Sequence, residues 1–198
     1  MYKSLSKISK CFVKMFFRVE VEGLENIPKE GACIIAGNHK SNWDPVFVAS
    51  LIDTRIINGV GKKELFKVTV LKSILKKCHV IPVDRENPDL STIKSILKVL
   101  KNGDVIGIFP EGTRHKDLNT FAEVKAGLGM FAVKGKSPVV PVSIVTNYKL
   151  FSKVYIYIDK PMEFEDYYAK RATSDDYTEI SNSVMNVIKS NYFRLKDK

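Results

Sequence analysis

The sequence predicts a single α/β domain with a largely parallel central sheet flanked by helices, together with an N-terminal amphipathic helix. Short apolar segments alternate along the chain with longer segments whose apolar residues recur every three or four positions. This alternation is typical of βαβ units, which build a parallel sheet with helices on both faces. A chain of 198 residues, 44% of them hydrophobic, is also long enough to bury one complete core. We therefore divide the chain into a helical segment, residues 1–20, and an α/β domain, residues 21–198.

Residues 1–20 are predicted to form an amphipathic helix. Its apolar side chains recur on one side, at Leu5, Ile8, Phe12, Met15, Phe16 and Val19. Its basic side chains recur on the other side, at Lys3, Lys7, Lys10, Lys14 and Arg18. Such a helix can lie in the headgroup plane of an anionic membrane or pack on its own domain, and the segment alone leaves both open. No apolar run approaches the roughly 20 residues that span a bilayer, and lysines interrupt the pattern of a signal peptide.

Seven strands are predicted, and the first of them overlaps the end of this helical segment. Short runs rich in valine and isoleucine, several of them closed by proline or glycine, place the strands at 18–28, 32–38, 55–61, 79–84, 104–110, 137–146 and 153–161. Most of these runs are apolar throughout, as expected for strands that are covered on both faces.

Five further helices follow from apolar residues at helical spacing, at 43–53, 62–78, 87–103, 121–135 and 174–195. Pro45 falls in the first turn of the first of these, where its missing N–H group costs nothing. A run of β-branched residues at 68–70 weakens the second. The third has the clearest limits, because Asn87 or Pro88 can begin it and Gly103 can end it.

The composition points to anionic partners and a reduced setting. The formal net charge is +10, so nucleic acid, phospholipid headgroups and acidic or phosphorylated substrates are the candidate partners. Cys11, Cys33 and Cys78 are odd in number and lack metal-ligand spacing, which favours a reduced, cytosolic protein. The three histidines are also scattered singly, so no metal site is predicted.

The first candidate site residues follow the strand at 32–38, in the stretch GNHKSNWDP. Its His39 and Asp44 are five residues apart. On a regular helix this spacing separates two side chains by roughly 140°. The two can therefore meet only if His39 lies in a loop that folds back over the first turn of the next helix. Loops at the carboxyl ends of parallel strands are the usual place for a site in an α/β sheet.

A second loop of this kind, FPEGTRH, follows the run of apolar residues at 104–110. Gly112 lets the backbone approach a ligand closely, and Thr113 offers a hydroxyl. Arg114 offers a planar guanidinium that matches the oxygens of a phosphate. Glu111 could orient Arg114 or hold a substrate hydroxyl. The alternative is an ordinary surface turn in which Glu111 and Arg114 pair with each other.

Five motifs in this order, NHKSNWDP, GKKELFK, VIPVDR, FPEGTR and SPVVPVSI, resemble the motif series of the 1-acylglycerol-3-phosphate acyltransferases. These are the bacterial lysophosphatidate acyltransferases of the glycerolipid acyltransferase family, and the resemblance runs from residue 33 to residue 144. It implies an α/β domain with a helical N-terminal membrane anchor, which transfers an acyl group from a thioester to a lysophospholipid hydroxyl. Two features depart from the family: VTV follows LFK where relatives often carry proline, and the anchor is a single short segment.

The resemblance also implies roles for particular residues. His39 and Asp44 carry the HX4D motif of the family and are expected to be the catalytic pair. The expected substrate-binding residues are the lysine of the second motif and the phosphate-binding loop: Lys62, Glu111, Gly112, Thr113 and Arg114. Lys63 is the less close candidate for the lysine position.

Acyl transfer to an alcohol needs a base that takes the hydroxyl proton as attack begins, and histidine, with an ordinary pKa of about 6.5, suits this role. Asp44 would fix the ring tautomer and stabilise the imidazolium, while the substrate hydroxyl replaces the serine of a hydrolase triad. No serine lies in a nucleophile-elbow sequence, although Ser41 is an alternative nucleophile. The other alternative for His39 is a loop histidine whose ring is fully satisfied by hydrogen bonds.

No cofactor is expected, because the acyl donor, acyl-CoA or acyl-ACP (acyl carrier protein), is a co-substrate. The expected partners are a lysophospholipid, this donor and an anionic membrane surface, on which the chain would be peripheral, at the cytoplasmic face of the cell membrane. The alternative acceptors are glycerol 3-phosphate and another lysophospholipid. A basic nucleic-acid-binding module is the alternative from another class. The sequence has no helix-turn-helix, RRM or KH signature, so no nucleic acid is expected as a partner.

Overall fold

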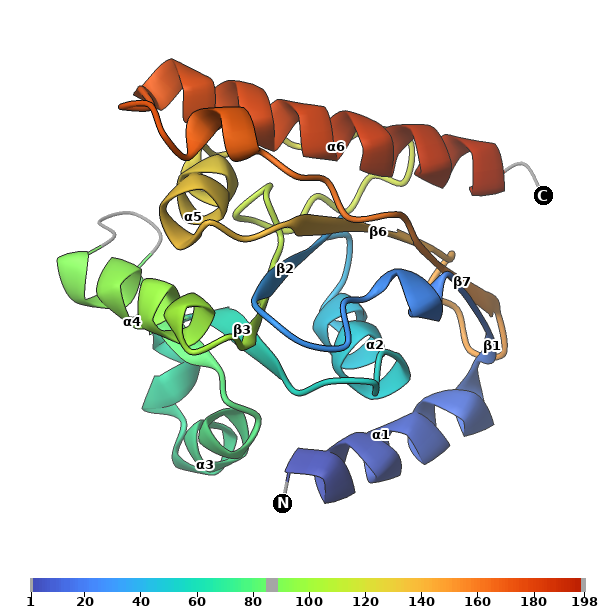
Figure 1. Cartoon of the computed structure of the whole chain (residues 1–198). Helices are drawn as coiled ribbons and strands as arrows, with labels where there is room; N and C mark the ends of the chain where they lie inside the picture. Colours follow the sequence, from blue (N-terminus) through green and yellow to red (C-terminus); the bar gives the residue numbers. More distant parts are fainter. Residues whose placement is uncertain (1, 85–88, 197–198) are drawn as a thin grey trace.

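A mostly parallel sheet runs through the middle of the molecule and separates two groups of helices (Figure 1). The computed structural model describes residues 2–84 and 89–196. Within them the sheet has seven strands in the order β1-β7-β6-β2-β5-β3-β4. The strands are β1 (Arg18–Glu22), β2 (Cys33–Gly37), β3 (Ile57–Lys62), β4 (Ile81–Val83), β5 (Val105–Ile108), β6 (Val139–Val145) and β7 (Lys153–Ile158). The helices are α1 (Tyr2–Phe16), α2 (Trp43–Leu51), α3 (Thr69–Lys77), α4 (Leu90–Lys101), α5 (Gly127–Gly135) and α6 (Ser174–Lys196), with 3₁₀ helices η1 (Leu24–Asn26), η2 (Lys63–Lys67) and η3 (Glu165–Tyr167).

The predicted fold class, an α/β domain with a largely parallel sheet, is confirmed. Among the described strands only β6 and β7 pair antiparallel, and the short loop 146–152 connects them. β2 pairs in parallel with β5 on one side and with β6 on the other. All five residues of β2 are buried, because helices cover both faces of the sheet at this strand.

Alternate residues of β2 contact different helix layers, as side chains of a strand point to opposite faces. Cys33 and Ile35 pack in the cluster that contains α1 and α2. Ile34 and Ala36 pack in the cluster that contains α4, α5 and α6 (Figure 1). The buried helix residues are Val13, Phe47, Val48 and Leu51 in the first cluster and Ile96, Leu100, Leu128, Phe131, Ala132, Val184, Met185 and Ile188 in the second. The two layers hold the carboxyl ends of β2 and β5 in a fixed position.

α1 is helical as predicted, but it packs on the domain through a different face. Tyr2 and Val13 are buried against the domain, and Ser6 donates a 3.0 Å hydrogen bond to the carbonyl oxygen of Ala49 in α2. Three large residues of the predicted apolar side are exposed instead: Ile8, Phe12 and Met15. In the described part of the chain, no helix has both the length and the apolar character needed to cross a membrane.

The predicted helix at 62–78 is interrupted at Val68. η2 ends at Lys67, and α3 begins at Thr69, after the extended backbone of Val68 (φ −83°, ψ 114°). β-branched residues lose side-chain freedom in a helix, which explains why the chain breaks at the run 68–70. The break coincides with the departure from the family pattern at the same residues.

Two other predicted helices begin later than expected. α4 begins at Leu90, because the carboxylate of Asp89 accepts the N–H group of Thr92 at 2.6 Å and caps the helix. The candidate start residues Asn87 and Pro88 lie outside the described residues, as does Arg85 of the third motif.

The helix predicted at 121–135 is wrong in its first six positions, since α5 begins only at Gly127. In the preceding segment, the N–H of Ala122 donates to Oε2 of Glu111, and the N–H of Lys125 donates to the carbonyl oxygen of Pro110, both at 2.9 Å. These donors are therefore committed to the loop after β5 and cannot take part in a helix.

Candidate active site

The candidate site residues gather where β2 and β5 end. These strands are parallel neighbours, so the loops that follow them lie at the same edge of the sheet. The loop after β2 carries His39, and the loop after β5 carries Glu111. The N–H of His115 donates to the carbonyl oxygen of His39 at 2.9 Å, so the two loops are also joined through their backbones.

Asn38 fixes the direction in which the chain leaves β2. Its buried amide imitates a peptide group: Nδ2 donates to the carbonyl oxygen of Ile144 at 2.9 Å, and Oδ1 accepts the N–H of Ile144 at 2.8 Å. Ile144 belongs to β6, so the side chain of Asn38 continues the pairing of β2 with β6 after the backbone has turned away. The backbone that leads into His39 is therefore held in a fixed position relative to β6.

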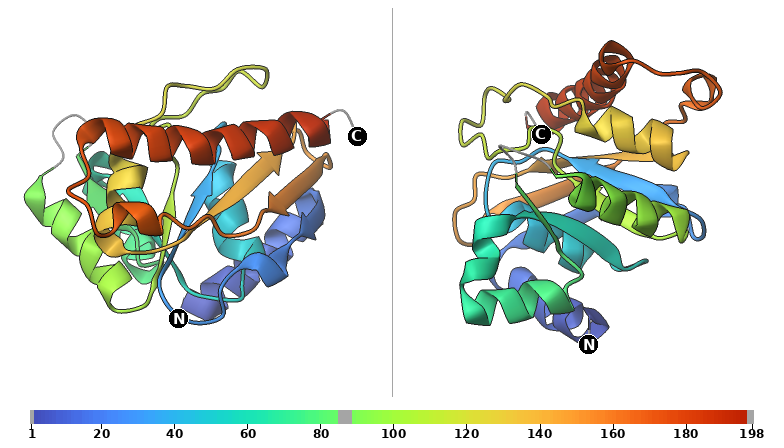
Figure 2. Two further views of the ribbon diagram at one scale, coloured as in Figure 1. Left: turned by 45° about the horizontal axis from the view of Figure 1, so that its top comes forward. Right: turned by 90° about the vertical axis from the view of Figure 1, so that its left-hand side faces the viewer.

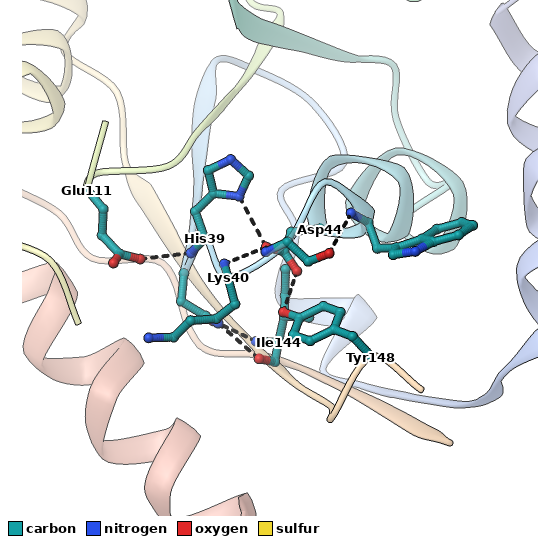
Figure 3. A network of polar contacts seen from close by, with 9 residues as sticks. His39, Lys40, Asp44, Glu111, Ile144 and Tyr148 are labelled. Carbon is teal, nitrogen blue, oxygen red and sulfur yellow. Dashed lines mark hydrogen bonds and ion pairs between the residues drawn. The ribbon is translucent and has the colours of Figure 1, made fainter. Parts of the chain in front are cut away.

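Asp44 lies in the first turn of α2 and is completely buried. Its Oδ2 accepts the N–H groups of Lys40 and Ser41, each at 2.7 Å, and lies 3.1 Å from Nδ1 of His39. Its Oδ1 accepts the hydroxyl of Tyr148 at 2.6 Å, and Figure 3 shows His39 and Tyr148 reaching Asp44 from different sides. The loop thus folds back over the first helical turn, where the helix N-terminus favours a negative charge.

These contacts decide which ring nitrogen of His39 carries a proton. The hydroxyl of Tyr148 and two backbone N–H groups all donate to Asp44, so its carboxylate acts as an acceptor. Nδ1 is therefore the protonated nitrogen, and Nε2 keeps its lone pair. Among the described residues, Nε2 has no hydrogen-bond partner. The structure thus differs from the alternative in which the ring of His39 is fully satisfied.

The ring of His39 is also held by Phe109, the first residue after β5. The two rings are stacked, with their centroids 4.3 Å apart and their planes inclined by 18°. His39 as a whole is only 5% exposed. Stacking on Phe109 and the contact with Asp44 together give the ring one orientation, with Nε2 on the side away from the carboxylate.

Tyr148 is a site residue that the sequence did not reveal. It lies in the loop between β6 and β7, with a left-handed backbone (φ 60°). Burial raises the pKa of Tyr148, and the negative charge of Asp44 raises this pKa further, so the hydroxyl stays protonated and remains a donor. A lone tyrosine in a polar loop carries no pattern that could have identified it.

Glu111 does not orient Arg114, which was one of the two roles considered for it. It is buried, and its Oε1 accepts the N–H of His39 at 2.8 Å (Figure 3). Its Oε2 accepts the N–H of Ala122 at 2.9 Å. Both oxygens are thus bound to backbone groups rather than to Arg114. The alternative of a surface pair between Glu111 and Arg114 is wrong for the same reason.

The rest of the FPEGTR loop turns outward at Gly112. Its N–H donates to the carbonyl oxygen of Phe109 at 3.0 Å, and its backbone is left-handed (φ 63°), a conformation that glycine adopts without strain. The next two side chains, Thr113 and Arg114, are exposed. Neither makes a hydrogen bond or an ion pair with any described residue. The guanidinium of Arg114 is therefore free to meet an anion.

Lys62 lies at the end of β3, which is the neighbour of β5. Its side chain is exposed and forms an ion pair with Glu64, with 3.7 Å between Nζ and Oε2. Lys63 begins η2 and is also exposed. Within the described chain, no hydrogen bond or ion pair joins either lysine to the other expected site residues. The structure places both at the same edge of the sheet as the two loops.

Lys40 is a second residue that the sequence analysis missed. Its amino group donates to the carbonyl oxygens of Asp117, at 2.9 Å, and of Thr120, and it lies 3.9 Å from the ring centre of Phe121. Burial lowers the pKa of Lys40, and the charge of Glu111 partly opposes this shift. Lys40 therefore holds the segment after Arg114 against the His39 loop. Its only signal was its place inside the first motif, since lysine is common throughout the chain.

No group of three or more His, Cys, Asp or Glu side chains in the described residues is placed to hold a metal ion. The three cysteines lie apart from one another as free thiols: Cys11 is exposed on α1, Cys33 is buried in β2, and Cys78 follows α3.

Comparisons relate the chain to known proteins. The model of a family described as Acyltransferase matches residues 18–145, more than half of the chain. A 1-acyl-sn-glycerol-3-phosphate acyltransferase from Bacillus subtilis (strain 168) is 35% identical over 172 residues, which cover 84% of this chain and 85% of that protein. Another from Streptococcus pneumoniae is 34% identical over 111 residues, 56% of this chain and 40% of that protein. The crystal structure of the 1-acyl-sn-glycerophosphate (LPA) acyltransferase PlsC from Thermotoga maritima aligns with a TM-score of 0.79 and 27% identity, and covers 100% of this chain and 80% of that one.

Proposed function

The chain belongs to the acyltransferase family, and from this premise we propose that it acylates the free hydroxyl of 1-acylglycerol 3-phosphate, using an acyl thioester and giving phosphatidate. The family predicted from the five motifs is confirmed. The relatives from B. subtilis and S. pneumoniae carry the name of this acceptor, and the reaction belongs to phospholipid biosynthesis. The observation that carries the mechanism is the free Nε2 of His39, on a ring whose other nitrogen is bound by Asp44.

We assign His39 as the general base. Its Nε2 takes the proton of the acceptor hydroxyl as the oxygen attacks the thioester carbonyl carbon. The tetrahedral intermediate then breaks its C–S bond, and the imidazolium returns the proton to the departing thiolate. Asp44, with Oδ2 at 3.1 Å from Nδ1, stabilises the imidazolium between these steps. Each turnover yields one ester and one thiol, and no residue of the chain is acylated.

Ser41 is a poor alternative nucleophile in this geometry. Its backbone N–H is bound to Asp44, and its hydroxyl oxygen accepts the N–H of Trp43 at 3.3 Å. No hydrogen bond joins its hydroxyl to His39 in the described residues, so no base is placed to activate it.

Arg114 is proposed to bind the acceptor phosphate. Its guanidinium is unpaired and lies on the loop that is bonded to His39 through the backbone of His115. A phosphate held by this planar fork, with Thr113 as a further donor and Lys62 as a second cation, would leave the glycerol hydroxyl facing the His39 loop. Gly112 provides the turn that brings these groups outward. Glu111 contributes indirectly, because it positions His39.

The donor is an acyl thioester, acyl-CoA or acyl-ACP, and no cofactor takes part in the proposed reaction. Both donors are anionic and are compatible with a net charge of +10. The reaction needs only proton transfer and positioning, and the two loops supply groups for both.

Residues 1–20 are proposed to attach the chain, as a peripheral protein, to an anionic membrane at its cytoplasmic face. α1 exposes bulky apolar side chains beside exposed lysines: Ile8, Phe12 and Met15, with Lys7 and Lys14. Leu150 and Phe151 are also exposed, and the N–H of Phe151 donates to the carbonyl oxygen of Phe16 at 2.7 Å, so this loop lies at the end of the helix. Exposed apolar side chains next to cations suit the interface of an anionic bilayer.

Radiolabelled acyl transfer tests the reaction. Acyl-CoA and acyl-ACP would each be offered to lysophosphatidate, glycerol 3-phosphate and lysophosphatidylcholine, and we expect phosphatidate as the main product. A preference for another acceptor would change the assigned substrate. If no donor–acceptor pair gives an ester, the proposal is overturned.

A pull-down that compares anionic liposomes with DNA at physiological salt tests which kind of partner the chain binds. A preference for DNA would favour a nucleic-acid-binding module.

A further inference from the structure

The segment formed by η2 and α3 exposes apolar side chains that nothing in the described chain covers. No residue of either helix is buried. Val70 is 72% exposed and Ile74 is 45% exposed, although valine and isoleucine are usually found inside proteins. Leu65 and Val68, just before α3, are exposed as well. A surface of this kind, outside the two core clusters, indicates contact with another apolar phase.

The same segment is strongly cationic. Together with Lys62, the last residue of β3, the segment contains six lysines and one acidic residue, Glu64. All six lysines are exposed: Lys62, Lys63, Lys67, Lys72, Lys76 and Lys77. The ion pair between Lys62 and Glu64 leaves the other five without an ion pair to any described residue. Whatever covers the apolar side chains must therefore also present negative charge.

The end of α3 also lies close to the start of α1, as the views in Figures 1 and 2 agree. His79, just after α3, makes an edge-on ring contact with Tyr2 at the start of α1, with 5.7 Å between centroids. The hydroxyl of Tyr2 accepts the N–H of Ile57 at 3.2 Å, which fixes α1 to β3, the strand that leads into η2. Two cationic helices that expose apolar residues are thus held next to each other.

We propose that η2 and α3 form a second membrane-contact element, which lies on the anionic bilayer together with α1. A bilayer fits these observations because it offers apolar depth and negative headgroups continuously along both helices. Lys62, at the start of the segment, would then bring the substrate-binding edge of the sheet to the surface in which a lysophospholipid is dissolved. This inference rests on the proposed membrane-associated function of the chain.

Vesicle co-sedimentation with the full chain tests the charge of the element. The double substitution Lys72→Gln/Lys76→Gln would be compared with Lys94→Gln/Lys98→Gln, a pair of exposed lysines with the same spacing on α4. Removal of two interfacial lysines should weaken binding to vesicles of phosphatidylglycerol and phosphatidylcholine about 30-fold, and the α4 pair should bind like the original chain. Circular dichroism would confirm that both variants are folded.

A second comparison tests the apolar contact. Val70→Ser would be set against Leu90→Ser on α4, where the side chain is exposed to a similar extent, 74% against 72%. Val70→Ser should weaken vesicle binding even at 0.5 M salt, where electrostatic attraction is screened, and Leu90→Ser should not. Equal binding by both members of each comparison would overturn the assignment of η2 and α3.

The failure of this inference can be told apart from failure of the proposed function. The unsubstituted chain would be assayed with a dispersed short-chain lysophosphatidate in the absence of vesicles. No turnover there contradicts the proposed function, whereas turnover combined with unchanged vesicle binding by Lys72→Gln/Lys76→Gln contradicts only the membrane element. If that variant binds vesicles normally but loses affinity for acyl-ACP, the surface serves an acidic protein, and the bilayer assignment is overturned.

Discussion

The hydroxyl of Tyr148 donates a 2.6 Å hydrogen bond to Oδ1 of Asp44, although 104 positions separate the two residues in the chain. The other carboxylate oxygen, Oδ2, faces Nδ1 of His39. Tyr148 therefore fixes the rotation of the carboxylate that fixes the histidine. It acts as a positioning residue, since it contacts Asp44 and not the reacting atoms.

Tyr148→Phe removes this hydrogen bond and preserves the ring. We expect kcat to fall roughly tenfold, equivalent to about 1.4 kcal/mol, with KM for both substrates nearly unchanged. Steady-state kinetics measure this separation. Tyr155→Phe is the matched control, because it removes a tyrosine–carboxylate bond to Glu22, away from the site. An equal loss in both variants would indicate a general effect on the fold.

His39→Ala removes the proposed base, and acyl transfer should fall at least about 100-fold, because proton transfer to a placed base accounts for that much or more. The variant should still bind liposomes, since His39 lies on the loop after β2 and not on α1 or α3. Acyl transfer and liposome co-sedimentation on the same preparation provide the test. Substantial residual turnover would remove the assignment of the base.

Arg114→Ala tests the phosphate contact. Loss of the guanidinium should raise KM for lysophosphatidate at least tenfold, or about 1.4 kcal/mol, and change KM for the acyl donor much less. Arg171→Ala, at another exposed arginine, controls for the loss of one positive charge. If KM rises equally for acceptor and donor, Arg114 does not hold the acceptor phosphate.

Glu111→Gln keeps the shape of a buried side chain but turns one acceptor into a donor. Because Glu111 accepts N–H groups from both His39 and Ala122, one of these groups would lose its partner. The free energy of unfolding should fall by about 1–3 kcal/mol, and kcat should fall with it. Urea denaturation measures the first effect, and the exposed Glu123→Gln is the control. Unchanged stability would show that the backbone contacts of Glu111 contribute little.

The cap of α4 gives a prediction for pH. The N–H of Thr92 lowers the pKa of Asp89 below its ordinary value of 3.8, so the charged cap stabilises the fold above that pH. This contribution is lost as the pH falls below about 4 and through the lowered pKa. Asp89→Ala should therefore lower the thermal midpoint at pH 7 and have less effect near pH 3. Asp89→Asn should keep a cap at both pH values, and an equally large effect of Asp89→Ala at pH 3 would contradict the assignment.

The strands and most helices could be predicted because their signals are local. Apolar runs and helical spacing lie within single segments of the sequence, and so do the two site motifs. α5 was expected to start too early because Ala122 and Lys125 look helical, whereas their N–H groups bind to Glu111 and Pro110 of another loop. Such competition depends on the tertiary fold and leaves no periodic pattern.

The reacting groups of the site could be predicted from the sequence, but most of the residues that position them could not. His39 and Asp44 carry a spacing that only a folded-back loop can satisfy, and the structure brings them to 3.1 Å. Tyr148 and Lys40 are long-range supports, and each belongs to a common residue type. Glu111 was recognised as part of a motif, but its burial and its backbone partners could be seen only once the chain was folded.

The loop between β6 and β7 connects α1 to Asp44 through two hydrogen bonds. Its Phe151 is bonded to the last residue of α1, and its Tyr148, three positions earlier, is bonded to Asp44. Removal of α1 would therefore remove one of the two contacts that hold this loop, and the carboxylate of Asp44 beside His39 would be held less firmly. The N-terminal helix thus helps to hold the catalytic pair in place.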